Sequence, residues 1–250
     1  MELRGRAALV TGGGTGVGRA IVLDLARAGC AVAVNYSRSE AEARATADEA
    51  RQLGVQAMLV RADVAEDAAV RGMVEQVVAD LGRLDIVVNS AGVTVQVPHA
   101  DLEALDDAAW DRVLGVNLKG PFNVIRAAMP HLRLSQGAVV NIGSIAGVHG
   151  IGSSLPYCAS KAALNNLTMT LARVLAPEVR INTVAPGFID TRWWKERPEY
   201  QLVRDFAARR APLGKVCQPE DVSQMVLALL GNDLITGEVV VLDGGFARAV

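Results

Sequence analysis

Short apolar runs rich in β-branched residues alternate with longer helical patterns along the whole chain. Seven of these runs lack the strict alternation of apolar and polar positions that marks a strand with one exposed face. They therefore predict parallel strands that helices cover on both faces. The predicted strands are Ala7–Gly12, Ala31–Tyr36, Gln56–Asp63, Leu84–Gly92, Ala138–Ser144, Arg180–Ala185 and Glu238–Asp243.

Between these runs, apolar residues recur every three to four positions, as on one face of a helix. The clearest stripes are Val17, Ile21, Val22 and Leu25, and Leu164, Leu167, Leu171 and Val174. Repeated β and α units imply right-handed crossovers. The pattern predicts an α/β doubly wound Rossmann fold, in which residues 1–250 form a single domain around a seven-stranded parallel sheet.

Composition narrows the classes of function. Aromatic residues make up 4% of the chain, while small apolar residues are abundant, which suits helices packed closely on a sheet. The formal net charge of -2 provides no field that attracts nucleic acid, so no nucleic-acid partner is expected. No apolar run approaches the roughly 18 to 20 residues of a membrane span, and the start does not resemble a secretory signal.

The three cysteines, Cys30, Cys158 and Cys217, form no C-x-x-C pair. Their odd number fits neither a disulfide framework nor a zinc site, so no metal is expected. We therefore expect a cytoplasmic protein whose thiols are structural.

A glycine-rich turn, Thr11–Gly18, lies between the first predicted strand and the first helix. Glycines permit positive φ and let a pyrophosphate approach the backbone, while the helix that begins there presents free N–H groups. At the start of a β-α-β unit, such a turn predicts a dinucleotide site. Its candidate cofactor-binding residues are Gly12, Thr15, Gly16, Val17 and Gly18.

Tyr157 and Lys161 are four residues apart and share one face of a helix. An ammonium beside a phenol favours the phenolate and moves its pKa from about 10 toward neutral pH, which makes Tyr157 a candidate acid and base. Ser144, at a strand end, can donate to the oxygen of a carbonyl that accepts hydride. From the residues alone, a buried Tyr157, a solvated Lys161 and a turn-capping Ser144 remain open alternatives.

The glycine pattern T-G-x-x-x-G-x-G resembles that of the short-chain dehydrogenase/reductase family, and further motifs follow in the family's order over nearly the whole chain. Asn89–Gly92 is similar to the family motif N-N-A-G, with Ser90 in place of the second Asn. The resemblance implies four catalytic positions, Asn117, Ser144, Tyr157 and Lys161. It also implies a homotetramer.

The resemblance further implies which residues contact the cofactor outside the glycine turn. Asp63 matches the residue that usually contacts the adenine, and Pro186, Gly187 and Thr191 match a segment beside the nicotinamide. The implied contacts are Ser37, Arg38, Asp63, Val64, Asn89, Ala91, Gly92, Tyr157, Lys161, Pro186, Gly187, Ile189 and Thr191.

The segment after the second strand indicates which dinucleotide is used. NAD enzymes commonly carry an acid there for the ribose hydroxyl, whereas a basic residue can accommodate a 2'-phosphate. Asn35–Arg38 contains no acid, and Arg38 offers a forked cation. NADP(H) is favoured and NAD(H) stays possible, because Arg38 can also be a solvated loop residue.

The irregular stretch of about residues 187–218 predicts a substrate lid, since long irregular segments in compact domains are usually functional. Trp193 and Trp194 are candidate walls of an apolar substrate pocket, although packing on the core or on a neighbouring subunit is an equal alternative. His149 is a weaker substrate candidate. His99 and His131 are expected on the surface or in turns.

The substrate is less constrained than the reaction. A 3-oxoacyl thioester is the leading candidate by similarity of length and motif layout, and a sugar, polyol, steroid or other secondary alcohol is the alternative. An enoyl reductase is disfavoured, because related enzymes of that type space Tyr and Lys more widely. A nucleotide-binding regulator without catalysis is the alternative of another class.

Pro121 is predicted to interrupt a helix over about residues 107–132 and to leave the carbonyl of Asn117 without its helical donor.

Overall fold

The protein is described by a computed structural model over residues 1–191 and 198–248. Seven parallel strands form one sheet in the order β3-β2-β1-β4-β5-β6-β7. The strands are β1 (Ala7–Thr11), β2 (Ala31–Tyr36), β3 (Ala57–Arg61), β4 (Ile86–Asn89), β5 (Ala138–Ile142), β6 (Arg180–Pro186) and β7 (Val239–Leu242). The predicted α/β doubly wound fold is confirmed.

The predicted ends of β2 match the observed ones, and the ends of the other strands differ from prediction by at most three residues. The largest difference is at β4, which was expected over Leu84–Gly92 and spans Ile86–Asn89. The apolar pattern continues past the last ladder hydrogen bond, because Ser90–Gly92 turns away from the sheet and contributes to a cleft. Hydrophobicity marks burial, whereas the strand ends where its backbone pairing ends.

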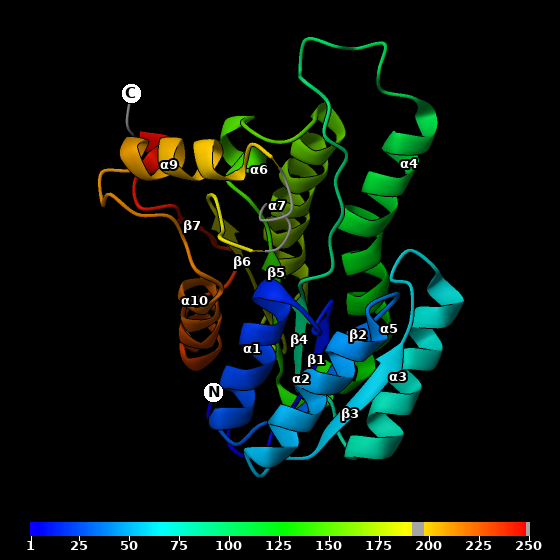
Figure 1. Ribbon diagram of the computed structural model, residues 1–250. Coiled ribbons are helices and arrows are strands. Elements are labelled where there is room, and N and C mark those ends of the chain that lie inside the picture. Colours follow the sequence, from blue (N-terminus) through cyan, green and yellow to red (C-terminus); the bar gives the residue numbers. More distant parts are fainter. Residues whose placement is uncertain (192–197, 249–250) are drawn as a thin grey trace.

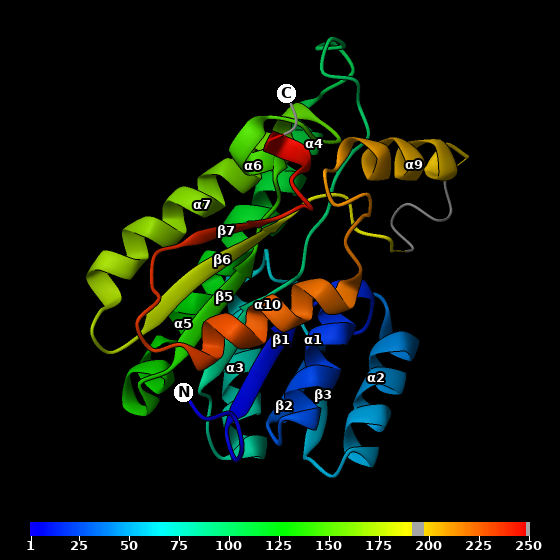
Figure 2. The same cartoon turned by 90° about the vertical axis from the view of Figure 1, so that its left-hand side faces the viewer.

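Helices cover both faces of the sheet (Figures 1 and 2). One face packs against α1 (Gly16–Arg27), α2 (Glu40–Gln52) and α10 (Pro219–Gly231), and the other against α3 (Asp67–Leu81), α5 (Gly120–Ser135) and α7 (Leu155–Leu175). Shorter elements lie near the carboxyl ends of the strands: α4 (Asp107–Leu114), α6 (Ala146–His149), α9 (Tyr200–Arg210) and the 3-10 turn Phe246–Arg248. No helix of the described residues is long and apolar enough to cross a membrane.

The helix expected over about residues 107–132 is divided by a π-helical turn, Gly115–Lys119. At this turn the N–H of Gly120 donates to the carbonyl of Gly115, five residues earlier. Pro121 follows in the first turn of α5, where a missing N–H is tolerated. The interruption therefore includes a widened turn before the proline, which the sequence did not indicate.

The apolar stripe read from the sequence of α7 is only partly the buried face of this helix. Leu164 is buried, but Val174 is 63% exposed. The helix instead buries Thr168, whose hydroxyl hydrogen-bonds to Asn141 on β5 and Thr183 on β6. A polar residue can occupy the core because its hydrogen bonds are satisfied there, and this rotation leaves apolar side chains of α7 outside.

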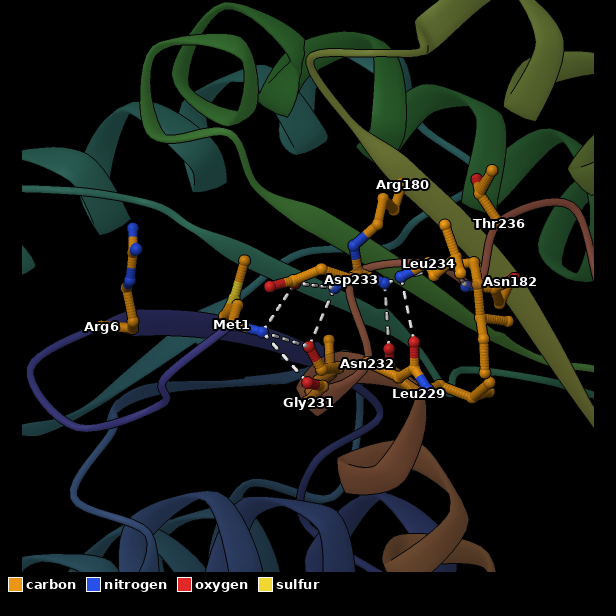
Figure 3. Close-up of polar contacts among 12 residues, drawn as sticks. Met1, Arg6, Arg180, Asn182, Leu229, Gly231, Asn232, Asp233, Leu234 and Thr236 are labelled. Atoms are coloured by element: carbon orange, nitrogen blue, oxygen red, sulfur yellow. Dashed lines mark hydrogen bonds and ion pairs between the residues drawn. The ribbon is translucent and has the colours of Figure 1, made fainter.

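The C-terminal end of α10 is held by two cations (Figure 3). Arg180 at the start of β6 donates to the carbonyls of Leu229 at 3.0 Å and Leu230 at 2.8 Å. The ammonium of Met1 donates to Leu230 at 3.2 Å and forms an ion pair with Asp233 at 2.7 Å. Carbonyls in the last turn of a helix lack helical donors, and cations there also match the helix dipole.

We predict that Arg180→Ala lowers the free energy of unfolding by about 1 to 3 kcal/mol, because half-buried carbonyls lose their donors. Denaturant unfolding at a fixed protein concentration measures the change. Arg173→Ala, at an exposed arginine of α7, is the control and should stay within about 0.5 kcal/mol of wild type. Equal stabilities of the two variants would contradict the role of Arg180.

Candidate active site

A cleft of about 1410 Å³ opens at the carboxyl ends of the strands. Its wall includes the turns after β1 and β4, between which the chain order of the sheet reverses. Ligands of open parallel sheets bind at such a switch point. Typical small-molecule pockets measure roughly 300 to 1,000 Å³, so this cleft has room for a dinucleotide together with a second molecule.

The glycine turn is packed so closely that side chains are excluded from it. A Cβ on Gly12, whose φ is +62°, would lie 3.0 Å from the Cα of Ala91, and a Cβ on Gly18 would lie 2.2 Å from the carbonyl oxygen of Gly12. Helix α1 begins at Gly16, and the side chain of Thr15 makes no capping hydrogen bond. The first N–H groups of α1 therefore remain available at the cleft, which fits the phosphates of a dinucleotide.

Ser144 and Tyr157 meet on the opposite wall of the cleft. Both side chains line the cleft, Ser144 lowers the pKa of the Tyr157 phenol, and the Ser144 hydroxyl accepts from the N–H of Ala146 at 3.1 Å. Ser144 follows β5, while Tyr157 lies in the first turn of α7, which Ser154 caps by accepting from the N–H of Tyr157. Two hydroxyls from separate elements thus face the cleft at one point.

Lys161 lies one turn further along α7 and is 5% exposed. Its Nζ donates to the carbonyl of Ile142 at 2.8 Å and lies 5.8 Å from the centre of the Tyr157 ring. Burial lowers the pKa of Lys161 to about 8. An ammonium has three donors, and within the described residues Nζ uses only one of them in a hydrogen bond.

The expected lowering of the Tyr157 pKa by Lys161 is not found. Burial raises the pKa of the phenol, the hydrogen bond with Ser144 lowers it, and Cys158 raises it, so that the pKa lies above its usual value. The ammonium approaches the carbonyl of Ile142 rather than the phenol oxygen, so desolvation dominates. Tyr157 consequently holds its proton at neutral pH in this structure.

Asn117 is fully buried in the π-helical turn, behind the cleft. Its side chain accepts from the N–H of Val93 and donates to the carbonyl of Val93, both at 2.9 Å. It also donates to Ser160 at 3.1 Å, and the Ser160 hydroxyl donates to the carbonyl of Tyr157 at 2.8 Å. Asn117 thereby links the turn after β4 to the helix that carries Tyr157.

The other end of the cleft is lined by the segment after β2. Ser37 and Arg38 are exposed there, and Asp63 lines the same region. Asn35 is buried instead: its Oδ1 accepts from the N–H of Gly12 at 3.4 Å, and its amide donates to the carbonyl of Ala62 at 3.1 Å. The amide of Asn35 therefore supports the glycine turn, and the side chain that projects at this rim is that of Arg38.

Comparisons with known proteins agree with this geometry. A family model described as "Enoyl-(Acyl carrier protein) reductase" matches residues 12–247. The chain is 41% identical over 239 residues to the "Granaticin polyketide synthase putative ketoacyl reductase 2" of Streptomyces violaceoruber, covering 95% of this chain and 94% of that protein. It is 36% identical over 249 residues to the 3-oxoacyl-[acyl-carrier-protein] reductase FabG of Thermotoga maritima, covering 98% and 99%.

A crystal structure of a dehydrogenase/reductase from Sinorhizobium meliloti matches with a TM-score of 0.89 and 36% sequence identity, covering 98% of this chain and 96% of that one. The chain belongs to the short-chain dehydrogenase/reductase family. This confirms the resemblance inferred from the motifs, and it makes the protein an oxidoreductase that acts on CH–OH groups.

This short-chain dehydrogenase/reductase brings most of the predicted site residues to one cleft. Those that line it are Gly12, Thr15, Gly16, Val17, Gly18, Ser37, Arg38, Asp63, Val64, Ala91, Gly92, Ser144, Tyr157, Lys161, Gly187, Ile189 and Thr191.

Four predicted residues lie outside the lining of the cleft. Asn117 and Asn89 are buried behind it, and Asn89 donates to Asn141 at 2.9 Å. Pro186 ends β6, and its carbonyl accepts from the N–H of Ile145. His149 is exposed and does not line the cleft, because it lies in α6 on the outer side of the turn after Ser144. Trp193 and Trp194 lie outside the described residues.

Several residues that line the cleft carried no signal in the sequence. They come from the segment after β4, from α9 and from the C-terminal turn: Gln96, His99, Val203, Phe206 and Phe246. His99 was expected on the surface and is half-buried in the cleft wall. These residues lie outside the motifs, and only the folded chain brings them into the cleft that Tyr157 lines. No group of three or more His, Cys, Asp or Glu residues in the described part of the chain is placed to hold a metal ion.

Proposed function

We propose that this short-chain dehydrogenase/reductase interconverts a ketone and a secondary alcohol with NADP(H), and that its substrate is a 3-oxoacyl thioester. The observation that carries the proposal is that Ser144, Tyr157 and Lys161 line the same cleft as the glycine turn. A proton donor and a dinucleotide cradle share one space there.

Tyr157 is the proposed acid and base. The bound nicotinamide supplies or accepts the hydride, and a carbonyl carbon that receives it leaves negative charge on its oxygen. Because its pKa is raised, Tyr157 is protonated at neutral pH. It can therefore give this proton to the negatively charged oxygen as the hydride arrives. Ser144, which lines the same cleft, donates to the same oxygen and stabilises the developing charge.

Lys161 and Asn117 are proposed to support Tyr157. With one donor on Ile142, the Lys161 ammonium keeps two for the cofactor ribose and for the phenolate that Tyr157 becomes. Asn117 positions α7 through Ser160, and its main-chain carbonyl is proposed to hold a water that returns protons from solvent. In an α-helix the carbonyl of Asn117 would accept from the N–H of residue 121. Pro121 has no N–H, so this carbonyl lacks that donor.

The preference for NADP(H) rests on Arg38. Within the described ranges its guanidinium makes no hydrogen bond or ion pair, although it lines the cleft. No acid occupies Asn35–Arg38, the segment in which NAD enzymes commonly bind the ribose hydroxyl. The 2'-phosphate of NADP(H) would give this cation a partner.

The choice of substrate class rests on the relatives, two of which are named as ketoacyl or 3-oxoacyl reductases. The description of the matching family model also names enoyl reduction, for which the four-residue spacing of Tyr157 and Lys161 is unfavourable.

We further propose that the segment of about residues 187–218 closes over substrate, since α9 contributes Val203 and Phe206 to the cleft. The free thiols support a cytoplasmic location.

An NADPH-oxidation assay across 3-oxoacyl thioesters, simple ketones, sugars, steroids and enoyl thioesters tests the proposal. Turnover of 3-oxoacyl thioesters above the other compounds is expected. Preference for a sugar, polyol or steroid would favour the alternative dehydrogenase, and tight NADPH binding without turnover of any compound would favour a regulator.

We predict that Tyr157→Phe lowers kcat by about 10² to 10⁴, with dinucleotide binding nearly unchanged, because only the proton is lost. Lys161→Ala should weaken both turnover and binding. Steady-state kinetics and titration with NADPH separate these effects. Lys119→Ala, at an exposed lysine outside the cleft lining, is the control. A Phe variant with about a tenth or more of the wild-type kcat would refute the role of Tyr157.

We predict that Arg38→Ala weakens NADPH binding about tenfold or more while NADH binding changes little, because only NADPH carries the phosphate that the guanidinium grips. Isothermal titration with both dinucleotides measures this. Arg44→Ala is the control, since Arg44 is already paired with Glu40 at 2.8 Å. Equal losses for both cofactors would assign Arg38 to general structure.

We also propose that the protein is a homotetramer, as the family resemblance implies. A shallow groove of about 460 Å³ between α5 and α7 is lined by Phe122, Ile125, Arg126, Met129, Pro130, Arg133, Leu171 and Leu175. Phe122 is 38% exposed on α5, and Met169 and Val174 are exposed on α7. Contiguous apolar side chains on adjacent helices support an interface with a second copy.

We therefore predict that Phe122→Asp lowers the molar mass in solution below that of the wild-type tetramer, because a carboxylate would be buried in the interface. Light scattering coupled to size-exclusion chromatography measures the mass. Leu53→Asp, at an exposed position of similar character at the end of α2, is the control. A monomeric wild type, or an unchanged mass for Phe122→Asp, would contradict this interface.

A further inference from the structure

His99 occupies a fixed place in the wall of the cleft. The segment that carries it is tied to the turn before α7: the N–H of Val97 donates to the carbonyl of Ser153 at 3.0 Å, and the hydroxyls of Thr94 and Ser153 are hydrogen-bonded. The His99 ring is half-buried, and its Nε2 lies 4.0 Å from the Sγ of Cys158. Cys158 directly follows Tyr157, so the imidazole lies near the reacting end of the cleft.

The contact with the Cys158 thiol engages Nε2 of His99 and leaves Nδ1 of the ring for a substrate. Burial raises the pKa of Cys158, so the thiol keeps its proton and can donate it, weakly, to Nε2. A neutral ring that accepts at Nε2 carries its own proton on Nδ1. Gly152 closes the other side of the thiol, because a Cβ there would lie 2.7 Å from Sγ. Cys158 therefore contacts the Nε2 side of the His99 ring and helps to hold the ring in place.

Other polar side chains of the described cleft lining have roles or partners already. Ser153 is hydrogen-bonded to Thr94, and Ser144 and Tyr157 line the cleft at the position proposed for the reacting oxygen. Gln96 lines the cleft too, but it is exposed to solvent. Within the described residues, His99 is a half-buried polar side chain of the cleft lining that contacts the neighbour of Tyr157 in sequence and can face a substrate.

Apolar side chains form much of the cleft wall in which His99 lies. Val203 and Phe206 of α9 line the cleft together with Phe246, whose ring packs edge-on against that of Phe206 at 6.4 Å. Ile151 and Pro98 also contribute to the lining. A polar group that loses water among such neighbours costs free energy unless it gains a partner.

We propose that His99 is a specificity-determining residue that donates a hydrogen bond to a second oxygen of the substrate, the thioester carbonyl of a 3-oxoacyl group. This assignment rests on the proposed function. A site built to hydrogen-bond a substrate oxygen discriminates against analogues that lack it, because the polar group of the site is then left unpaired. His99 would therefore select 3-oxoacyl compounds over simple ketones.

The test compares two substrates with NADPH: a 3-oxoacyl N-acetylcysteamine thioester and an aliphatic methyl ketone of the same chain length. His99→Leu should raise KM for the thioester about tenfold with kcat nearly unchanged, because a bond made equally in ground and transition states affects KM alone. KM for the ketone should stay constant. His99→Asn, which keeps a donor near the position of Nδ1, should recover most of the affinity for the thioester.

His131→Leu is the matched control, since His131 lies near the far end of α5 and does not line the cleft. Inhibition by the corresponding 3-hydroxyacyl thioester and by the matched alcohol gives a second measurement that requires no turnover of the weaker substrate. A wild-type enzyme without preference for the thioester, or a His99→Leu variant that keeps the preference, would overturn the assignment to His99. Absence of turnover with any carbonyl compound would instead contradict the proposed function.

Discussion

The hydrogen bond from Asn141 on β5 to Thr168 on α7 fixes how the helix that carries Tyr157 and Lys161 sits on the sheet. It is one link in a buried chain, because Asn89 on β4 donates to Asn141 and Thr168 bonds Thr183 on β6. Buried polar groups are satisfied in only one rotation and one translation of the helix. Two turns earlier on α7, the same register brings the Nζ of Lys161 to the carbonyl that follows Asn141 in sequence.

Close packing of Gly147 against α7 also fixes the position of the turn that carries Ser144. A Cβ on Gly147 would lie 2.4 Å from the backbone carbon of Lys161, so α6 rests directly on the main chain of α7. The carbonyl of Pro186 accepts from Ile145 on the other side of the same turn. With Gly147 against one helix and Ile145 against β6, the Ser144 side chain has little freedom except to face Tyr157. Two hydroxyls from different elements are thereby aligned by backbone contacts.

The same rotation of α7 has a consequence on the outside of the molecule. Because Thr168 takes a core position with its hydrogen bonds satisfied, the apolar stripe of the helix is turned partly away from the sheet. Leu171 is half-buried and lines the groove together with Phe122 and Met129 of α5, and Val174 of α7 is exposed. The rotation of α7 that places Tyr157 and Lys161 in the cleft thus also exposes apolar side chains of the same helix.

Periodicity and motif order were enough to predict the doubly wound sheet, the glycine turn, and the cleft positions of Ser144, Tyr157 and Lys161. They were sufficient because parallel strands converge at one edge whatever the packing details. The buried face of α7, the π turn before Pro121 and the raised pKa of Tyr157 were not predictable, since each depends on partners distant in sequence. The same holds for His99, which enters the cleft only because its segment pairs with Ser153 and rests on Cys158. Local pattern determines which residues share a face or a strand end, whereas desolvation and hydrogen-bond partners are properties of the assembled fold.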